Sequence, residues 1–420
     1  MPQSFVRMSA TKTHIDKKKS LVPILRFKEV NDAWHSHKIG EIINNKSQKY
    51  NPEKAKESFK CIELEHLSTS TGELLGYIDS VNSASIKNKF NNGDILFGKL
   101  RPYLRKYLRA PFDGVCSSEI WVLKGEKINN DFLYQIVQSD FFINLANQST
   151  GSKMPRADWN VVANGIINFP TLPEQQKIAS FLSAVDEKLQ QLTRKKQLLE
   201  QYKKGVMQQL FSGKLRFKDE NGKAFPKWEE KKLGDVGNTF NGLTGKTKEN
   251  FGEGKPYIQY MQIFANPKID ITKCGLVQID ADENQPRVQY GDIFFTTSSE
   301  TTHEIGFTSV LQEKVEEMYL NSFCFGFRPN SLEQLNPAFA SYLFRNEIFR
   351  KIIIKLAQGS TRYNMSKVQL MKLKVLLPCI EEQKKIAIFL SNIDNKIESV
   401  TKQITQTQTF KKGLLQQLFV

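Results

Sequence analysis

One short segment of the sequence concentrates side chains that could bind a polyanion. Gly98–Lys106 is rich in turn-forming residues and holds four cations and a tyrosine: Lys99, Arg101, Tyr103, Arg105 and Lys106. Lysine can neutralise backbone phosphates, whereas arginine can donate two hydrogen bonds to O6 and N7 of guanine. A solvated lysine-rich hairpin would have the same composition. We favour contact with DNA, because the whole chain carries a formal net charge of +16, which also points to a nucleic-acid partner.

A second polar segment, Thr296–His303, occupies the corresponding place in the other half of the chain. It is uncharged or acidic, and its candidates for DNA contact are Thr297, Ser298 and Ser299. Hydroxyl groups can bind bases, and a carboxylate can accept a hydrogen bond from N4 of cytosine. The different chemistry at equivalent positions predicts that the two segments prefer different base sequences.

Two Gly-Ser loops supply the other candidates for contact with DNA. Gly151–Arg156 and Gly359–Asn364 each combine backbone freedom, hydroxyl or polar groups and one arginine just before an expected strand. The candidate residues are Ser152, Lys153, Arg156, Ser360, Thr361, Arg362 and Asn364. The two arginines do not align, so their roles can differ. A purely structural turn is the alternative for any one of these residues.

No motif in the chain supports catalysis. Gly242–Thr247 resembles a phosphate-binding loop, but its first glycine lies too close to the Gly-Lys-Thr, so we interpret it as a flexible basic loop with Lys246 as a DNA-binding candidate. The Asn-Pro pairs lack the aromatic ending that amino-methyltransferases use, and His35 and His37 have no matching ligand cluster. We therefore expect no catalytic residue, no metal site and no cofactor bound by this chain.

The rest of the composition fits a cytoplasmic protein. The five cysteines are scattered without a Cys-x-x-Cys pair, as expected in a reducing compartment. No apolar run approaches the ~20 residues that span a bilayer. The first 24 residues are expected to form a loose basic tail, and Met8 is an alternative start.

The chain contains an internal repeat. Gly151–Ser212 aligns without a gap onto Gly359–Val420, with PEQQKIASFLSAVDEK (Pro173–Lys188) over EEQKKIAIFLSNIDNK (Glu381–Lys396). A second repeated block places Leu215-Arg216-Phe217 and Trp228 over Leu25-Arg26-Phe27 and Trp34. Between these blocks the copies diverge almost completely. This layout predicts one shared frame that carries two different inserts.

The repeated segment has the 4-3 apolar spacing of a coiled coil in both copies, without a proline inside either run. Two unrelated amphipathic helices are the alternative. The expected seam consists of Ile178, Leu182, Val185, Leu189, Leu192, Leu199, Val206 and Leu210 in the first copy, and Ile386, Leu390, Ile393, Ile397, Val400, Ile404, Leu414 and Leu418 in the second.

Connectivity predicts that the two helices pair antiparallel. The first helix leads from the first insert to the second, and the second helix can return alongside it. The chain would then be nearly cyclic and pseudo-twofold, with Val420 close to the Leu25–Ile42 block and the inserts at opposite ends of a rod. The fixed helix length should fix the separation of the two inserts.

The inserts read as α/β (α+β) modules. We expect strands after the Gly-Asp turns at 93–94 and 291–292, later strands at Val115–Leu123 and Tyr319–Phe327, and helices over Phe132–Ala146 and Pro337–Leu356. The predicted regions are a basic tail at 1–24, DNA-reading domains at 25–158 and 213–366, and conserved regions with the coiled-coil helices at 159–212 and 367–420.

These features resemble the specificity (S) subunits of type I restriction–modification systems. The resemblance is carried by the repeated Pro/Glu-Glu-Gln-x-Lys-Ile-Ala-x-Phe-Leu-Ser-x-x-Asp block, the two 4-3 helices and the paired divergent inserts, and it covers nearly all of 25–420. One departure is Glu381 in the place of Pro173, which should alter only the start of the helix.

The resemblance implies two target recognition domains that read the halves of a split, asymmetric site in double-stranded DNA. It also implies two modification (M) subunits that carry S-adenosylmethionine and methylate adenine, and two restriction (R) subunits that use ATP and Mg. One alternative is the specificity part of a fused methylase–nuclease, and another is a coiled-coil DNA-binding adaptor without sequence preference.

Overall fold

The computed structural model describes residues 5–7, 23, 25–30, 32–54, 57–83, 85–148 and 154–419. The chain divides into two compact units, unit 1 with Met1–Arg194 and Thr401–Val420, and unit 2 with Lys195–Val400. Both long helices are divided between the two units, because each half packs on the nearest insert. The predicted regions at 25–158, 159–212, 213–366 and 367–420 follow the repeat and stay predictions.

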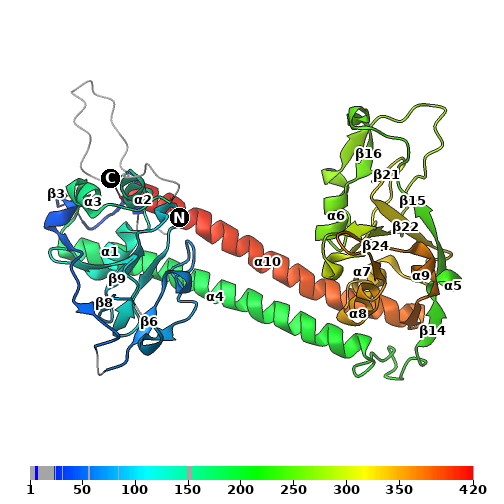
Figure 1. The fold of residues 1–420 in the computed structure, drawn as a ribbon, viewed down its shortest axis with the longest axis horizontal. Coiled ribbons are helices and arrows are strands. Elements are labelled where there is room, and N and C mark those ends of the chain that lie inside the picture. Colours follow the sequence, from blue (N-terminus) through cyan, green and yellow to red (C-terminus); the bar gives the residue numbers. More distant parts are fainter. Residues whose placement is uncertain are drawn as a thin grey trace. The chain divides into compact units, whose positions relative to one another are not determined.

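The described strands of unit 1 form a four-stranded sheet, a five-stranded sheet and two strand pairs; β3, β6, β8 and β9 are labelled in Figure 1. In the four-stranded sheet, in the order β10-β9-β12-β4, the strands are β10 (Tyr107–Arg109), β9 (Ile95–Gly98), β12 (Ile120–Gly125) and β4 (Ile43–Asn44). The five-stranded sheet has the order β5 (Lys49–Tyr50), β8 (Lys87–Phe90), β11 (Gly114–Cys116), β6 (Lys60–Ile62) and β7 (Ile78–Asp79). The pairs are β1 (Phe5–Arg7) with β2 (Leu25–Phe27), and β3 (His35–Lys38) with β13 (Ile166–Phe169). The described part of the expected loose tail thus contains a strand, β1.

Three short helices cover the four-stranded sheet of unit 1. They are α1 (Asn130–Ile136), α2 (Asp140–Asn147) and α3 (Trp159–Asn164). The expected single helix over Phe132–Ala146 is two helices, because the Ser139 side chain accepts a hydrogen bond from the backbone N–H of Phe142 and caps a new helix. The expected strand over Val115–Leu123 is likewise two strands, β11 and β12.

Unit 2 repeats this plan with its own sheets. One sheet has the order β15 (Gly237–Asn241), β22 (Cys324–Pro329), β18 (Ile293–Thr296) and β20 (Thr308–Val310). A second sheet has the order β17 (Gly275–Val277), β16 (Phe251–Ile258) and β21 (Tyr319–Leu320). A third has the order β19 (Ser298–Ser299), β24 (Tyr363–Met365) and β23 (Ala357–Gln358). In addition, β14 (Glu229–Lys232) pairs with β25 (Lys374–Leu377). The helices are α5 (Leu233–Val236), α6 (Tyr260–Ala265), α7 (Pro337–Leu343), α8 (Glu347–Ile354) and α9 (Lys367–Lys372). Here too one expected helix is two, since the Asn346 side chain caps α8.

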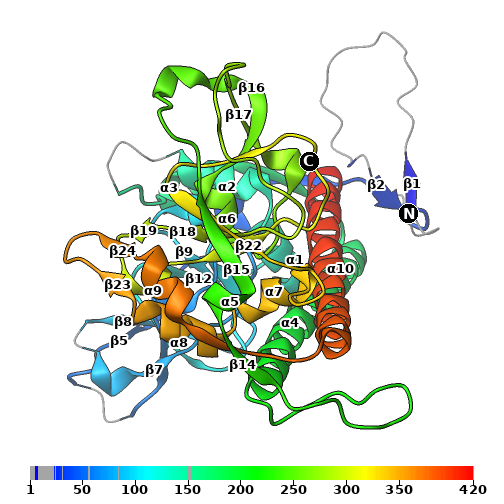
Figure 2. The same cartoon turned by 90° about the vertical axis from the view of Figure 1, so that its right-hand side faces the viewer.

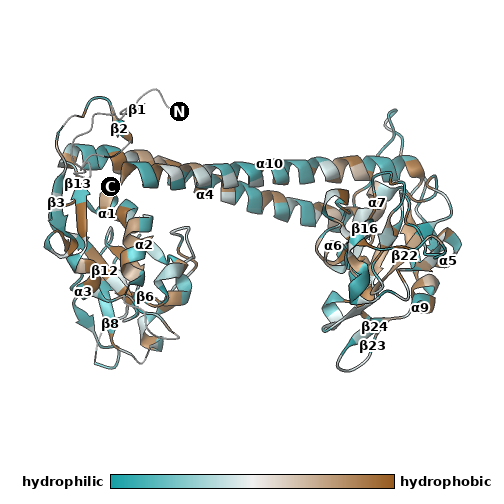
Figure 3. Ribbon diagram, turned by 90° about the horizontal axis from the view of Figure 1, so that it is seen from above, coloured by the Kyte–Doolittle hydropathy of each residue, from teal (hydrophilic) through white to brown (hydrophobic). Residues whose placement is uncertain are grey.

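The two long helices are α4 (Leu172–Phe211) and α10 (Ile380–Leu418). They begin at residues that align in the repeat. The exchange of Pro173 for Glu381 therefore does not move the start of the helix, contrary to the prediction, because a proline is tolerated in the first turn. Figure 3 shows both helices as largely hydrophilic with intermittent apolar positions. All sixteen expected seam residues are buried or half-buried.

The helices pair antiparallel within each unit. In unit 1, Ile178 and Leu182 of α4 share a core with Leu414 and Leu418 of α10. In unit 2, the end of α4 (Val206 and Leu210) shares a core with the beginning of α10. The contacts therefore recur with the roles of the helices exchanged, which is the pattern of the predicted pseudo-twofold.

The chain is nearly cyclic, as predicted. The end of α10 lies in the same core as Leu25, Phe27 and Trp34 of the first repeated block. The ring of Phe419 lies 5.4 Å from the ring of Phe132. Both ends of the described frame thus meet inside unit 1.

Each long helix is anchored by a buried glutamate in its first turn. Arg26 donates from Nε and Nη2 to the two carboxylate oxygens of Glu174, at 2.8 Å each, and the Trp34 indole donates to Oε2 at 3.3 Å. In unit 2, Glu382 accepts from Arg216 at 2.9 and 2.6 Å and from Trp228 at 3.0 Å. Both carboxylates are 0% exposed. The second repeated block is therefore conserved between the copies because it supplies the donors for these carboxylates.

Removing the first carboxylate should destabilise unit 1 strongly. Glu174→Ala leaves the Arg26 guanidinium, only 8% exposed, without its counter-charge, which costs about 3–5 kcal/mol. Glu382→Ala should cost less, because Arg216 is 29% exposed and water can solvate it. Urea unfolding measures both. As the control, Lys374→Ala breaks an exposed pair with Glu230 and should cost less than about 1 kcal/mol; equal losses in all three variants would contradict the anchor.

Candidate nucleic-acid interface

In unit 1 the structure brings two of the predicted DNA-binding segments together. The chain leaves β9 in an extended conformation, and the backbone of Lys99 donates to the carbonyl of Glu119 at 2.9 Å and accepts from the N–H of Ala157 at 2.8 Å. The N–H of Arg101 donates to the carbonyl of Pro155 at 2.7 Å. The cationic segment and the end of the Gly-Ser loop are therefore neighbours, although more than fifty residues separate them in the sequence.

A tight turn presents two of the predicted side chains to solvent. Pro102 begins a single 3-10 turn that Arg101 and Arg105 flank in the left-handed region, with φ of 51° and 50°. Non-glycine residues rarely adopt this conformation. As a result the side chain of Arg101 is exposed and Tyr103 is 53% exposed. The turn therefore has the composition and the exposure of a site for phosphates or bases.

Two other cations of the same segment are used inside unit 1. Arg105 pairs with Asp140 at the start of α2 and donates to the carbonyl of Gln138 at 3.2 Å. Lys106 donates from Nζ to the carbonyl of Leu64 at 2.7 Å. Contact of Arg105 and Lys106 with DNA stays a prediction, and it would have to compete with these contacts, which hold the turn on the sheet.

Arg156 lies beside the Lys99 strand and remains open to solvent. Its Nε donates to Glu119 Oε2 at 3.0 Å, and its side chain is 60% exposed. Glu119 comes from the turn that precedes β12, and sequence reasoning did not include it in the site. Ser152 and Lys153 lie outside the described residues.

We call the surface formed by the Lys99 segment and its neighbours at Glu119 and Ala157 the platform of unit 1. Unit 2 has a matching platform, formed by its own segments. The N–H of Thr297 donates to the carbonyl of Phe323 at 3.1 Å, and the carbonyl of Thr297 accepts from the N–H of Met365 at 3.0 Å. Ser298 pairs with Asn364 across β19 and β24. The hydroxyl segment and the second Gly-Ser loop therefore lie side by side, in the same register as their counterparts in unit 1.

The second Gly-Ser loop is the tip of a hairpin formed by β23 and β24 (Figure 2). Gly359 has φ of 126°, and a Cβ there would lie 2.2 Å from the carbonyl oxygen of Arg362, so only glycine fits this turn. The tip and the strand after it present exposed polar side chains to solvent: Ser360, Thr361, Arg362 and Asn364.

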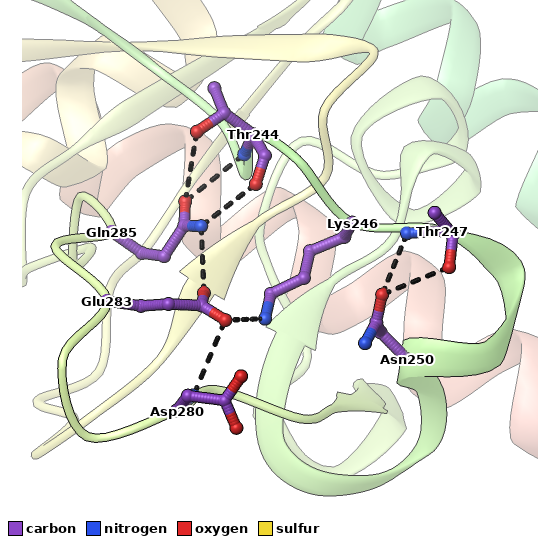
Figure 4. A network of polar contacts seen from close by, with 7 residues as sticks. All are labelled: Thr244, Lys246, Thr247, Asn250, Asp280, Glu283 and Gln285. Carbon is purple, nitrogen blue, oxygen red and sulfur yellow. Dashed lines mark hydrogen bonds and ion pairs between the residues drawn. The ribbon is translucent and has the colours of Figure 1, made fainter.

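Two predicted DNA-binding residues of unit 2 are not at the surface. Ser299 is 7% exposed, and its hydroxyl bonds to Glu304 at 3.3 Å. Lys246 is 5% exposed and its Nζ pairs with Glu283, inside a polar network that also contains Thr244, Gln285 and Asn250 (Figure 4). The hydrogen bond from Lys246 helps to lower the pKa of Glu283 to about 2. Lys246 of the segment Gly242–Thr247 therefore has a partner within unit 2, and its predicted contact with DNA would have to compete with Glu283.

A half-buried arginine holds the end of the hydroxyl segment of unit 2 in place. Arg350 of α8 donates to the carbonyls of His303, Ile305 and Gly306 at 2.7–2.9 Å, and its guanidinium lies 4.4 Å from the centre of the Phe307 ring. Burial lowers the pKa of Arg350 to about 10. The sequence offered no signal for this role, because the helix and the carbonyls are far apart in the chain.

An exposed phenylalanine was also missed by sequence reasoning. Phe323 is 60% exposed, although its backbone is fixed by hydrogen bonds to Asn321 and Thr297. Tyr260 and Met261 come from α6, and the hydroxyl of Tyr260 donates to the carbonyl of Ser298 at 3.0 Å. The ring of Phe323 therefore lies at the surface beside the hydroxyl segment, to which its backbone is bonded.

The described residues offer neither a cluster for a metal ion nor a helix that could span a membrane. They contain no group of three or more His, Cys, Asp or Glu side chains that could hold a metal ion. Among the same residues, every helix is too short or too polar to cross a membrane.

Comparisons with known proteins agree with this architecture. The family model of the type I restriction modification DNA specificity domain matches twice, at residues 31–201 and 226–408. A putative type I restriction enzyme MjaX specificity subunit of Methanocaldococcus jannaschii is 35% identical over 209 residues, which cover 48% of each chain. The MjaVIII specificity subunit of the same organism is 26% identical over 354 residues, covering 77% of this chain and 75% of the relative. The first match thus spans about half of that relative, and the second three quarters.

Solved structures share the fold. The S subunit of a type I restriction–modification system from M. genitalium aligns with a TM-score of 0.56 and 17% identity, over 95% of this chain and 99% of that one. A chain from a structure of a type I R-M system aligns with a TM-score of 0.57 and 20% identity, over 91% of this chain and 96% of that one. With two matched domains that cover most of its length, the chain belongs to the type I restriction modification DNA specificity family.

The exposed arginine of the hairpin tip provides a test of base contact. If Arg362 grips a base with two hydrogen bonds, Arg362→Ala should weaken binding to the preferred site by about 1–3 kcal/mol and relax one position of it. Arg362→Lys keeps the charge without the planar fork. Binding to a set of single-base variants of the site distinguishes the roles: a lysine that restores the full preference would show that Arg362 contacts a phosphate instead.

Proposed function

We propose that this chain is the specificity subunit of a type I restriction–modification complex and that each unit reads one half of a split, asymmetric site in double-stranded DNA. The observation that carries the proposal is the repeated platform. Two segments meet in the same register in each unit, yet the side chains on them differ. One scaffold with two unlike surfaces suits a site with two unlike halves.

The partners and cofactors follow from the family. Two modification subunits would supply S-adenosylmethionine and methylate adenine, and two restriction subunits would supply ATP- and Mg-dependent cleavage. This chain itself would bind no cofactor and carry no catalytic residue, and it would act in the cytoplasm.

A repeated groove offers a place for two copies of one partner. In unit 2 a groove of about 620 Å³ lies between the end of α4 and the start of α8 and is lined by Lys203, Lys204, Met207, Gln208, Glu347 and Asp394 among others. In unit 1 a groove of about 460 Å³ is lined by the aligned residues Lys411, Lys412, Leu415, Gln416, Asp140 and Asp186. Matching grooves favour one modification subunit at each unit.

Filling one groove should remove one partner. Gln208 and Gln416 are exposed, aligned residues of the two grooves. Gln208→Trp and Gln416→Trp should each give a complex with one modification subunit, and the double variant a complex with none, because the indole occupies the groove. Light scattering of the copurified complex measures the stoichiometry. Leu376→Trp, at an exposed position of β25 outside both grooves, is the control. Two subunits retained in both single variants would contradict docking there.

Two other functions remain to be separated from the proposal. A DNA-binding adaptor without sequence preference would bind random and selected duplexes equally, and the unlike surfaces of the platforms disfavour it. A fused methylase–nuclease that includes this chain as its specificity part would cross-link S-adenosylmethionine without a partner. A salt-dependent gel shift with and without modification subunits distinguishes the first, and a cross-linking experiment the second.

The central test is to map adenine methylation in cells that express this chain with its modification subunits. We expect one asymmetric motif whose two specified parts are separated by a fixed number of unspecified base pairs. Exchanging Gly98–Lys106 with Thr296–His303 should alter the specified bases. Methylation without any common motif, or a motif that the exchange leaves unchanged, would contradict the assignment of these segments.

A further inference from the structure

The two platforms align residue for residue, and this alignment allows their side chains to be compared. In unit 1, Glu119, Lys99 and Ala157 form one row of backbone hydrogen bonds, and in unit 2 the same row is Phe323, Thr297 and Met365. The next pair along the ladder is Leu100 with Arg156 in unit 1 and Ser298 with Asn364 in unit 2. Arg156 therefore corresponds to Asn364, and Glu119 corresponds to Phe323.

The backbone of the two platforms is the same at these two positions, but the side chains differ in chemistry. In unit 1 they form an ion pair in which Arg156 donates to Glu119 at 3.0 Å. In unit 2 they are an exposed amide and an exposed aromatic ring, on Asn364 and Phe323. The backbone at both places is fixed by the same hydrogen bonds. The difference thus lies in what the surface can recognise, not in how it is held.

We propose that this pair of positions decides which base pair each unit prefers at one equivalent place in its half-site. In unit 1, Arg156 is oriented by Glu119 and selects guanine. In unit 2, Asn364 selects adenine, and Phe323 contacts the methyl group of a thymine. The inference rests on the proposed function and extends it to the class of base that each unit recognises.

The geometry in unit 1 suits guanine. A guanidinium carries five donors in a planar fork, and the contact with Glu119 engages Nε, on one side of the fork. A hydrogen bond from Nε to a carboxylate restrains the orientation of the group, and the planar fork of donors matches the acceptors O6 and N7 of guanine. Glu119 is therefore a positioning residue. Lys99 and Arg101 lie on the adjoining strand and turn, where cations can hold the phosphates on either side.

The geometry in unit 2 suits an A·T pair. An asparagine amide has one acceptor and two donors, which match N6 and N7 of adenine. Phe323 presents its ring to solvent from a rigid turn, and apolar contact with the thymine methyl is a recognised use of phenylalanine in the major groove. A glutamate at this place could not make that contact, and an arginine in place of Asn364 would have no carboxylate to orient it.

The test exchanges the pairs between the units in the full-length chain, copurified with its modification subunits. The two variants are E119F/R156N in unit 1 and F323E/N364R in unit 2. Each complex is incubated with a library of duplexes in which both half-sites are randomised, and the bound sequences are read. We expect E119F/R156N to replace one guanine by adenine in one half-site, and F323E/N364R to make the reverse change in the other. Each exchange should shift the preference by roughly 5- to 150-fold.

The outcomes separate this inference from the proposed function. If the wild-type complex selects no motif, the proposed function fails. If it selects a motif that neither exchange alters, or if the exchanges weaken binding equally for all sequences, only the inference fails. Should an exchanged chain not fold, Arg156→Lys and Asn364→Ser at these exposed positions carry the test. Each must flatten the preference at one base pair of one half-site, and an unaltered motif overturns the proposal.

Discussion

A carboxylate without solvent contact at the start of each long helix ties the parts of the protein together. Glu174 and Glu382 accept hydrogen bonds from an arginine and a tryptophan that lie in the repeated block before each insert. The next residue, Gln175 or Gln383, accepts from the backbone N–H of Asn129 or Asn336, which cap α1 and α7. Each insert is therefore joined to its helix at two places by groups that cannot be left unpaired in the interior.

One further ion pair in each unit joins the two helices, and its residues are half-buried except for the buried Lys411. Lys411 of α10 pairs with Asp186 of α4 in unit 1, and the aligned residues Lys203 and Asp394 pair in unit 2 at 2.6 Å with the helices exchanged. Burial lowers the pKa of Lys411, and Asp186 counteracts this. Another register would leave a charge without its partner inside the seam. Polar groups at seam positions thus select one pairing at some cost in stability, as in other coiled coils.

The same frame supports unlike surfaces because backbone hydrogen bonds, rather than side chains, build the platforms. The rows that contain Lys99 and Thr297 have equal registers, so side chains on them can vary without altering the fold. Cation content alone does not define the interface. Arg105, Lys106 and Lys246 are tied to partners within their own unit, whereas Arg101 and Arg362 project to solvent.

The sequence by itself determined the repeat, both long helices with their seam, the antiparallel pairing and the segments that form the platforms. Helix periodicity and chain connectivity are local or topological properties, so they can be read without coordinates. Only the tertiary structure decided which candidate side chains are exposed, because the partners of Arg105, Lys106 and Lys246 come from distant parts of the chain. It also revealed Glu119 and Phe323, whose importance depends on the strand beside them. Burial and pairing are properties of contacts between remote segments, and no local pattern encodes them.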